Sequence, residues 1–162
     1  MKAAAVLVVS LLFLSPLLAQ TSSPAPSPAK AEDISGMYSF QRDGEFVQLT
    51  VEDAGDLTGF ISRYGDTESD RGAFLNQFFK SGRLDGAKVS FTTETVHAVW
   101  YEFKGVVERT SGKNPADEGY RVLRGTLSEN RSDADKKVSS KSREVVFKSF
   151  PQDLEAAPPK RD

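Results

Sequence analysis

The chain has 162 residues, with 21 Lys and Arg against 23 Asp and Glu, and it contains no cysteine. The lack of cysteine excludes disulfides, thiolate catalysis, cysteine-based metal sites and a lipid-anchored cysteine behind a leader. Because there is no basic excess, we expect neither nucleic acid nor an anionic membrane surface as a partner.

Residues 1–19 have the pattern of a signal peptide. Lys2 supplies the positive start, residues 3–14 are apolar, and Ala19 is a small residue suited to cleavage. The apolar run is shorter than the roughly 20 residues that a membrane-spanning helix needs. We therefore expect cleavage after Ala19, no membrane span in the mature chain, and a periplasmic or extracellular location; a membrane anchor is the alternative.

Three further segments follow the leader. Residues 20–33 are rich in Pro, Ser and Ala and predict a disordered linker, because they cannot bury enough apolar surface to offset the entropy of ordering. Residues 34–150 predict one folded domain, and residues 151–162 predict a flexible C-terminal tail.

The folded part begins with short strand patterns separated by turn residues. Residues 36–40 predict a first strand, and Asp43-Gly44 marks a tight turn. Residues 46–51 then alternate, with Val47 on the inward face. Residues 57–63 predict a third strand, which Gly59 would bend.

The pattern changes after these strands. Phe74, Leu75, Phe78 and Phe79 lie at offsets 0, 1, 4 and 5, which favours one short helix over about 70–81. Asp70 would cap its start and Gly82 would follow its end. The alternative is a strand, because Phe is also a good strand former.

The remaining chain returns to strand patterns. Residues 89–93 and 96–109 predict a β-hairpin, 120–127 and 143–150 predict further strands, and 129–142 predict a long mobile loop because they show no apolar period. The sum is an all-β protein. Seven or eight strands would form an antiparallel meander, closed or nearly closed into a barrel.

Several strand pieces also share a family-like pattern: Gly36-x-Tyr38, Leu57-Thr58-Gly59, Gly86-x-x-Val89-Ser90-Phe91, Phe103-Lys104-Gly105-Val106-Val107 and Leu123-Arg124-Gly125-Thr126. Across residues 36–150 this resembles exported bacterial β-barrel domains of the lipocalin-like, or calycin, type. Tyr38 stands where the lipocalin pattern has Trp. The resemblance implies an eight-stranded up-and-down barrel and names no ligand.

The second hairpin strand holds the candidate ligand contacts. Alternation places His97, Tyr101 and Phe103 on one face and Trp100 on the other. The hypothesis is a pocket formed by those four residues together with Phe78 from the predicted helix. The alternative is that the aromatic rings fill the core and His97 is structural. A lone histidine cannot supply a typical zinc set, and the sequence predicts no metal, no cofactor and no catalytic residue.

Three functional hypotheses remain. The first is a non-enzymatic barrel that binds a small apolar ligand or a partner in the cell envelope. The second is a hydrolase that uses Glu94, His97 and Glu102, which would have to meet in one cleft. The third is a protein-interaction domain that uses a Phe74–Phe79 helix, which would leave an exposed apolar patch there.

Overall fold

The computed structural model describes residues 33–151, so the predicted signal peptide (1–19), nearly all of the linker (20–33) and nearly all of the tail (151–162) lie outside the described residues. Within that range the chain forms eight strands and two single-turn 3-10 helices. In order these are β1 (Gly36–Ser39), β2 (Phe46–Val51), η1 (Asp53–Gly55), β3 (Leu57–Tyr64), η2 (Glu68–Asp70), β4 (Phe74–Asp85), β5 (Lys88–Thr93), β6 (Val99–Arg109), β7 (Arg121–Ser132) and β8 (Val138–Lys148).

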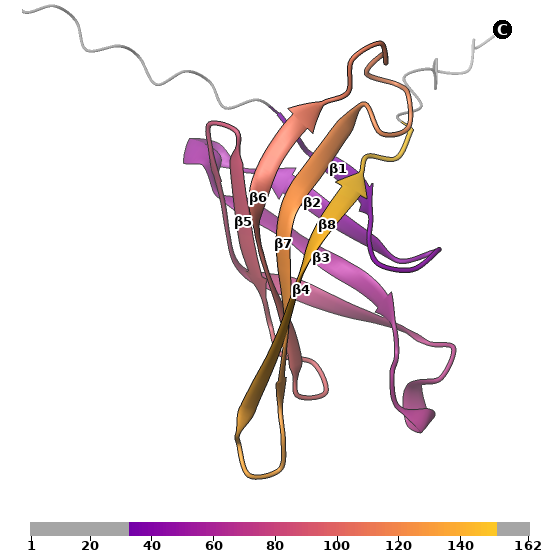
Figure 1. Cartoon of the computed structure of the whole chain (residues 1–162), viewed down its shortest axis with the longest axis vertical. Helices are drawn as coiled ribbons and strands as arrows, with labels where there is room; N and C mark the ends of the chain where they lie inside the picture. Colours follow the sequence, from indigo (N-terminus) through magenta and orange to yellow (C-terminus); the bar gives the residue numbers. More distant parts are fainter. Residues whose placement is uncertain (1–32, 152–162) are drawn as a thin grey trace, which may run out of the picture.

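Each strand pairs with the next in an antiparallel, up-and-down sheet in the order β1 to β8. The sheet curls until its two ends meet, which confirms the predicted all-β meander (Figure 1). Tyr38 and Ser149 form an isolated antiparallel bridge, and the amide of Phe150 donates to the carbonyl of Met37 at 2.9 Å. Because β1 has four residues and β8 has eleven, this seam is closed at one end only.

Side chains fill the interior of the barrel. Its buried residues come from every strand, and the rings of Phe91, Phe103 and Phe147 contact one another with centroids 5.3 and 5.4 Å apart. At Gly59 the strands approach so closely that a Cβ would collide with the carbonyl oxygen of Gln48, and its φ of 151° lies in the region that favours glycine.

The predicted helix over about 70–81 is wrong. Phe74 to Asp85 form strand β4, which pairs with β3 from Phe74 opposite Tyr64 to Phe78 opposite Phe60. The spacing misled because the aromatic residues of β4 do not share one environment. Phe74 and Phe78 are 49% and 56% exposed on the outside, whereas Phe79 packs against the core. The sheet partners supplied by β3 and β5 decide the conformation, and such pairing outweighs local propensity.

The long loop predicted over 129–142 is also wrong. β7 runs on to Ser132 and β8 starts at Val138, so these residues form a hairpin that projects beyond the other strands (Figure 1). Hydrogen bonds between the two strands hold it, such as Ser128 to Ser142 at 2.8 Å. Residues 138–142 are exposed on both faces, so they carry no apolar period that the sequence could reveal.

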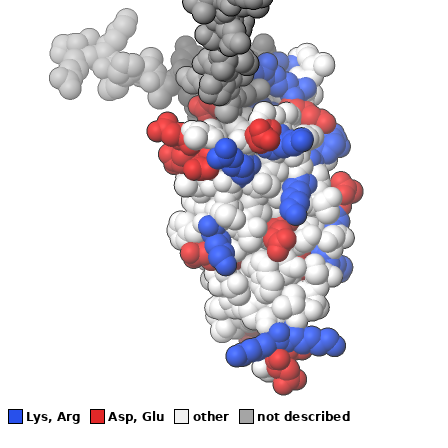
Figure 2. Space-filling model, turned by 90° about the vertical axis from the view of Figure 1, so that its left-hand side faces the viewer, with Lys and Arg blue, Asp and Glu red and all other residues white. Residues whose placement is uncertain are grey.

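Acidic and basic side chains are interspersed on the side of the molecule that carries β5 and β6 (Figure 2). Neither sign forms a continuous patch on that face. Within residues 33–151, no helix is both long and apolar enough to cross a membrane.

Candidate functional site

The five predicted ligand contacts do not converge. Tyr101 and Phe103 point into the barrel and are 3% and 0% exposed, whereas Phe78 lies outside on β4. Trp100 lies on the outer face of β6, where its Nε1 donates to Glu102 at 3.4 Å. His97 is about half exposed on the turn before β6, with Nδ1 2.7 Å from Asp70. Phe103 packs in the core, and of the five only Tyr101 lines a described cavity.

The cavity that Tyr101 lines, called the mouth cavity below, has a volume of about 170 Å³. The β1–β2 connection, the end of β3 with the loop after it, β6 and β7 all contribute to its wall. Its lining residues are Gln41, Arg42, Glu45, Arg63, Asp66, Tyr101, Glu129 and Arg131. Three arginines therefore face three carboxylates around one phenol.

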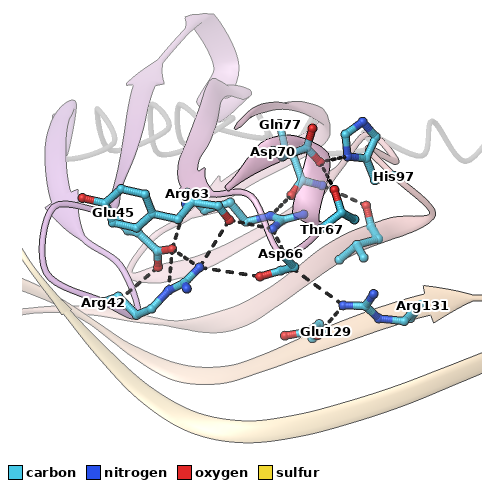
Figure 3. Close-up of polar contacts among 12 residues, drawn as sticks. Arg42, Glu45, Arg63, Asp66, Thr67, Asp70, Gln77, His97, Glu129 and Arg131 are labelled. Atoms are coloured by element: carbon cyan, nitrogen blue, oxygen red, sulfur yellow. Dashed lines mark hydrogen bonds and ion pairs between the residues drawn. The ribbon is translucent and has the colours of Figure 1, made fainter. Parts of the chain in front are cut away.

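Arg63 is the buried cation of this site, with a side chain only 2% exposed. It lies on β3 at the same parity as the core residues Leu57 and Ile61, so the strand turns it inward. Its Nε donates to Gln77 at 2.6 Å and its Nη1 to Asp66 at 2.8 Å (Figure 3). These bonds hold the guanidinium rigidly, 5.7 Å from the centre of the Tyr101 ring.

Glu45 balances the second arginine of the site. Its carboxylate is buried and accepts hydrogen bonds from Nε of Arg42 at 2.8 Å and from the amide of Tyr64 at 3.0 Å. The Arg42–Glu45 pair raises the pKa of the Arg42 guanidinium, chiefly through that hydrogen bond. Asp66 and Glu129 lie near Arg131 at 3.8 and 3.7 Å (Figure 3). Each acidic group of the lining therefore faces an arginine.

The Tyr101 hydroxyl differs from these groups. Its backbone amide is held by Thr93 Oγ1 at 3.0 Å, but among residues 33–151 no group hydrogen-bonds its phenol oxygen. Burial raises the pKa of Tyr101 to about 12, so the phenol is a neutral donor at physiological pH. A fixed, nearly buried donor without a partner beside a cavity can bind an acceptor on a ligand.

Sequence reasoning did not find Arg63, Gln77 or the acidic residues of the site. Arg63 could have been found, because its parity in the 57–63 strand is that of the core. Gln77 could not, because the expected helix gave it no inward direction. Glu129 and Arg131 fell in the segment predicted as a loop.

The hydrolase residues do not form a shared site. His97 contacts Asp70, and Glu102 accepts hydrogen bonds from Trp100 and Asn130, both at 3.4 Å. Glu94 is exposed, and within the described part of the chain its side chain makes no hydrogen bond or ion pair with His97 or Glu102. Only its backbone takes part in the interior network, since its carbonyl accepts from Gln77 at 3.2 Å.

The eight-stranded meander with its filled core forms an up-and-down β-barrel, the fold that the sequence resemblance implies. Among the solved structures that share this fold are avidin-like proteins. The rhizavidin–biotin complex aligns with a TM-score of 0.54 at 10% identity over 72% of this chain and 99% of that one. Apo short afifavidin aligns with a TM-score of 0.53 at 13% identity over 74% and 98%.

A third avidin-like structure, apo shwanavidin, aligns with a TM-score of 0.51 at 14% identity, over 75% of this chain and all of that one. No protein-family model matches the chain, and no curated protein matches it by sequence. At such identities the likeness concerns the fold.

Proposed function

We propose that this protein is a non-enzymatic barrel that binds a small ligand at the mouth cavity. The observation that carries the proposal is the Tyr101 hydroxyl, which is held beside the cavity next to Arg63 and has no hydrogen-bond partner among residues 33–151. Binding needs a fixed donor and a cavity, and both are present. No hydrogen bond or ion pair joins Glu94, His97 and Glu102 among residues 33–151, so these residues give no comparable support to hydrolysis.

The size and polarity of the cavity limit the ligand. Its volume of about 170 Å³ is below the roughly 300–1,000 Å³ of pockets that enclose a drug-sized molecule. The cavity would therefore hold a compact head group that carries a hydrogen-bond acceptor, such as a urea or amide carbonyl, while an apolar remainder lies outside. Biotin has such a carbonyl, and two neighbouring structures, those of rhizavidin and bradavidin2, are described as biotin complexes. Biotin is the first ligand to test.

Isothermal titration calorimetry of the purified chain with biotin and with ethyleneurea, the bare head group, tests this function. Tyr101→Phe should weaken binding about fivefold, because a net hydrogen bond is worth about 1 kcal/mol. Tyr120→Phe, which removes the hydroxyl of a residue outside the cavity lining, is the matched control and should leave binding unchanged. If neither compound binds saturably, or if Tyr101→Phe binds as tightly as the wild type, the proposal is wrong.

We further propose that the protein is exported and acts in the periplasm or outside the cell. The pattern of residues 1–19 supports this, with its single lysine, apolar run and Ala19. Expression in a bacterial host followed by mass spectrometry of the extracytoplasmic fraction would reveal a chain that begins at Gln20. Recovery of only the uncleaved chain in the cytoplasm would contradict export.

A second candidate function is contact with another component of the cell envelope. Phe74 and Phe78 lie on the outside of the barrel, 49% and 56% exposed, and Phe78 continues a row of rings through Phe60 to Phe46. Chemical cross-linking in cells supports this function if Phe78→Ser removes a cross-linked product that Val138→Ser, an exposed apolar residue elsewhere, retains. A product unaffected by Phe78→Ser counts against it.

A further inference from the structure

A second cavity lies at the open part of the β1–β8 seam and is called the seam cavity below. It has a volume of about 330 Å³ and is lined by residues 40–42 on one side and by Arg143, Val145, Val146 and Phe147 on the other. The cavity exists because β1 ends at Ser39. The edge of β8 that faces away from β7 therefore has no strand partner ahead of the bridge at Ser149. The seam thus leaves part of the inner face of the barrel accessible.

Arg143 is the unusual residue of this cavity. It lies opposite Leu127 on β7 and at the same parity as Val145 and Phe147, so its side chain points to the inner face of β8. Its Nη2 is buried, and it is the one buried side-chain nitrogen or oxygen among residues 33–151 that has no hydrogen-bond partner. A buried guanidinium nitrogen left unpaired is costly, and native proteins pair such groups.

The surroundings of Arg143 indicate what the missing partner is. No acidic residue lines the seam cavity, in contrast to the balanced charges of the mouth cavity. Arg42 is the other cation of the lining, but Glu45 already neutralises it through an ion pair of 2.6 Å. One positive charge therefore remains, and an anion would satisfy it.

The rest of the lining is apolar. The ring of Phe40 packs against Phe147 and Tyr101 with centroids 5.3 and 5.4 Å away, and Val146 is 39% exposed. A free inorganic anion would find no donors on these walls beyond the arginines and Gln41. An anion attached to an apolar chain would bury that chain against Phe40 and the valines.

We propose that the seam cavity binds the carboxylate of an apolar monocarboxylic acid, with Arg143 as its cationic partner. The carboxylate accepts hydrogen bonds from the Arg143 guanidinium, and the hydrocarbon chain lies against Phe40, Val145 and Val146. This site is separate from the mouth cavity, although Gln41 and Arg42 line both. It stands whether or not the mouth cavity binds biotin.

Octanoate is the probe, and octanol, which has the same chain without the charge, is the control ligand. In calorimetry, octanoate should bind saturably and at least about ten times more tightly than octanol, the ratio that 1.4 kcal/mol gives. Arg143→Met should remove this preference. Arg124→Met makes the same change on the exposed outer face of β7 and should leave it intact.

Thermal unfolding gives a second readout that keeps the test decisive. Without ligand, Arg143→Met should unfold at a higher temperature than the wild type, because it removes an unpaired buried cationic nitrogen. Octanoate should raise the unfolding temperature of the wild type and of Arg124→Met but not that of Arg143→Met. Equal binding of octanoate and octanol, or undiminished octanoate binding by Arg143→Met, overturns the proposal.

The test of the mouth cavity and the test of the seam cavity can give independent results. Tyr101→Phe should weaken the binding of a head group at the mouth cavity and leave the binding of octanoate unchanged. Loss of both ligands in Tyr101→Phe would mean that the cavities form one site, and the proposal of a separate seam site would be wrong.

Discussion

Nε of Arg63 donates a hydrogen bond of 2.6 Å to Oε1 of Gln77 inside the barrel, where neither residue is more than 2% exposed. The amide nitrogen of Gln77 in turn donates to the carbonyl of Val99 at 2.9 Å and to that of Glu94 at 3.2 Å. This one side chain therefore joins the cation of the mouth cavity to the turn between β5 and β6.

Replacing Gln77 with leucine should lower the free energy of unfolding by about 3 kcal/mol or more, because it leaves Nε of the buried, charged Arg63 unpaired and removes both hydrogen bonds from the Gln77 amide to the turn. Asn76→Leu makes a similar change at the neighbouring exposed position and should stay within about 0.5 kcal/mol of the wild type. Urea unfolding monitored by Trp100 fluorescence measures both. A smaller loss in Gln77→Leu than in Asn76→Leu would contradict this role.

Replacing Ala98 with glycine should stabilise the turn between β5 and β6. His97 and Ala98 have φ values of 50° and 63° in a two-residue turn closed by mutual hydrogen bonds between Val96 and Val99. Positive φ at both central positions is the geometry that favours Asn-Gly, and a residue with a Cβ there is strained by about 1–2 kcal/mol. Ala98→Gly should therefore raise the free energy of unfolding by about 1 kcal/mol.

Ala87→Gly is the matched control for this change, because Ala87 is exposed in the β4–β5 turn and has no positive φ. It should leave stability unchanged or lower it, since glycine adds entropy to the unfolded chain. Chemical denaturation of both variants provides the comparison. Destabilisation by Ala98→Gly would show that the turn is not strained.

The Asp70–His97 contact should make stability depend on pH in the acid range. The pKa of Asp70 is lowered, first by the hydrogen bond from Thr67 Oγ1 and then by the nearby His97. A lowered folded pKa gives stability that is present above the unfolded value of about 3.9 and is lost as pH falls through the folded pKa. Asp70→Asn should therefore reduce the fall in unfolding temperature between about pH 5 and pH 3.

The exposed Asp85 at the end of β4 supplies the control for this titration. Asp85→Asn should follow the wild-type pH curve. If Asp70→Asn also follows the wild-type pH curve, the contact between the β3–β4 loop and the β5–β6 turn contributes nothing to stability in acid.

Tyr101 should govern stability at alkaline pH. Its folded pKa is raised to about 12 by burial, whereas an unfolded tyrosine ionises near pH 10. A raised folded pKa gives stability that is complete below about pH 10 and is lost as pH rises toward 12. Tyr101→Phe should lose less stability than the wild type between about pH 9 and pH 11.5, and Tyr120→Phe should match the wild type. Parallel curves for all three proteins would contradict the burial of an ionisable phenol.

The sequence by itself determined the all-β meander, because period-2 patterns such as Phe46–Val51 and turn residues such as Asp43-Gly44 act locally. It also placed Tyr101 and Phe103 on one inward face of their strand, since alternation needs no knowledge of neighbours. The eight-stranded up-and-down barrel was implied by the resemblance that short motifs over residues 36–150 carry. These features depend on contacts between residues close in sequence or on family pattern.

Only the tertiary structure decided that Phe74–Asp85 is a strand, because its conformation depends on pairing with β3 and β5. The same holds for the hairpin of β7 and β8, which is held by pairing between the two strands. Its projecting end shows no apolar period from which a strand could be predicted. Both cavities arise where segments distant in sequence meet: Arg63 meets Tyr101 across the barrel, and Arg143 faces Phe40 across the open seam. No local pattern encodes such meetings, because the curl of the whole sheet brings those side chains together.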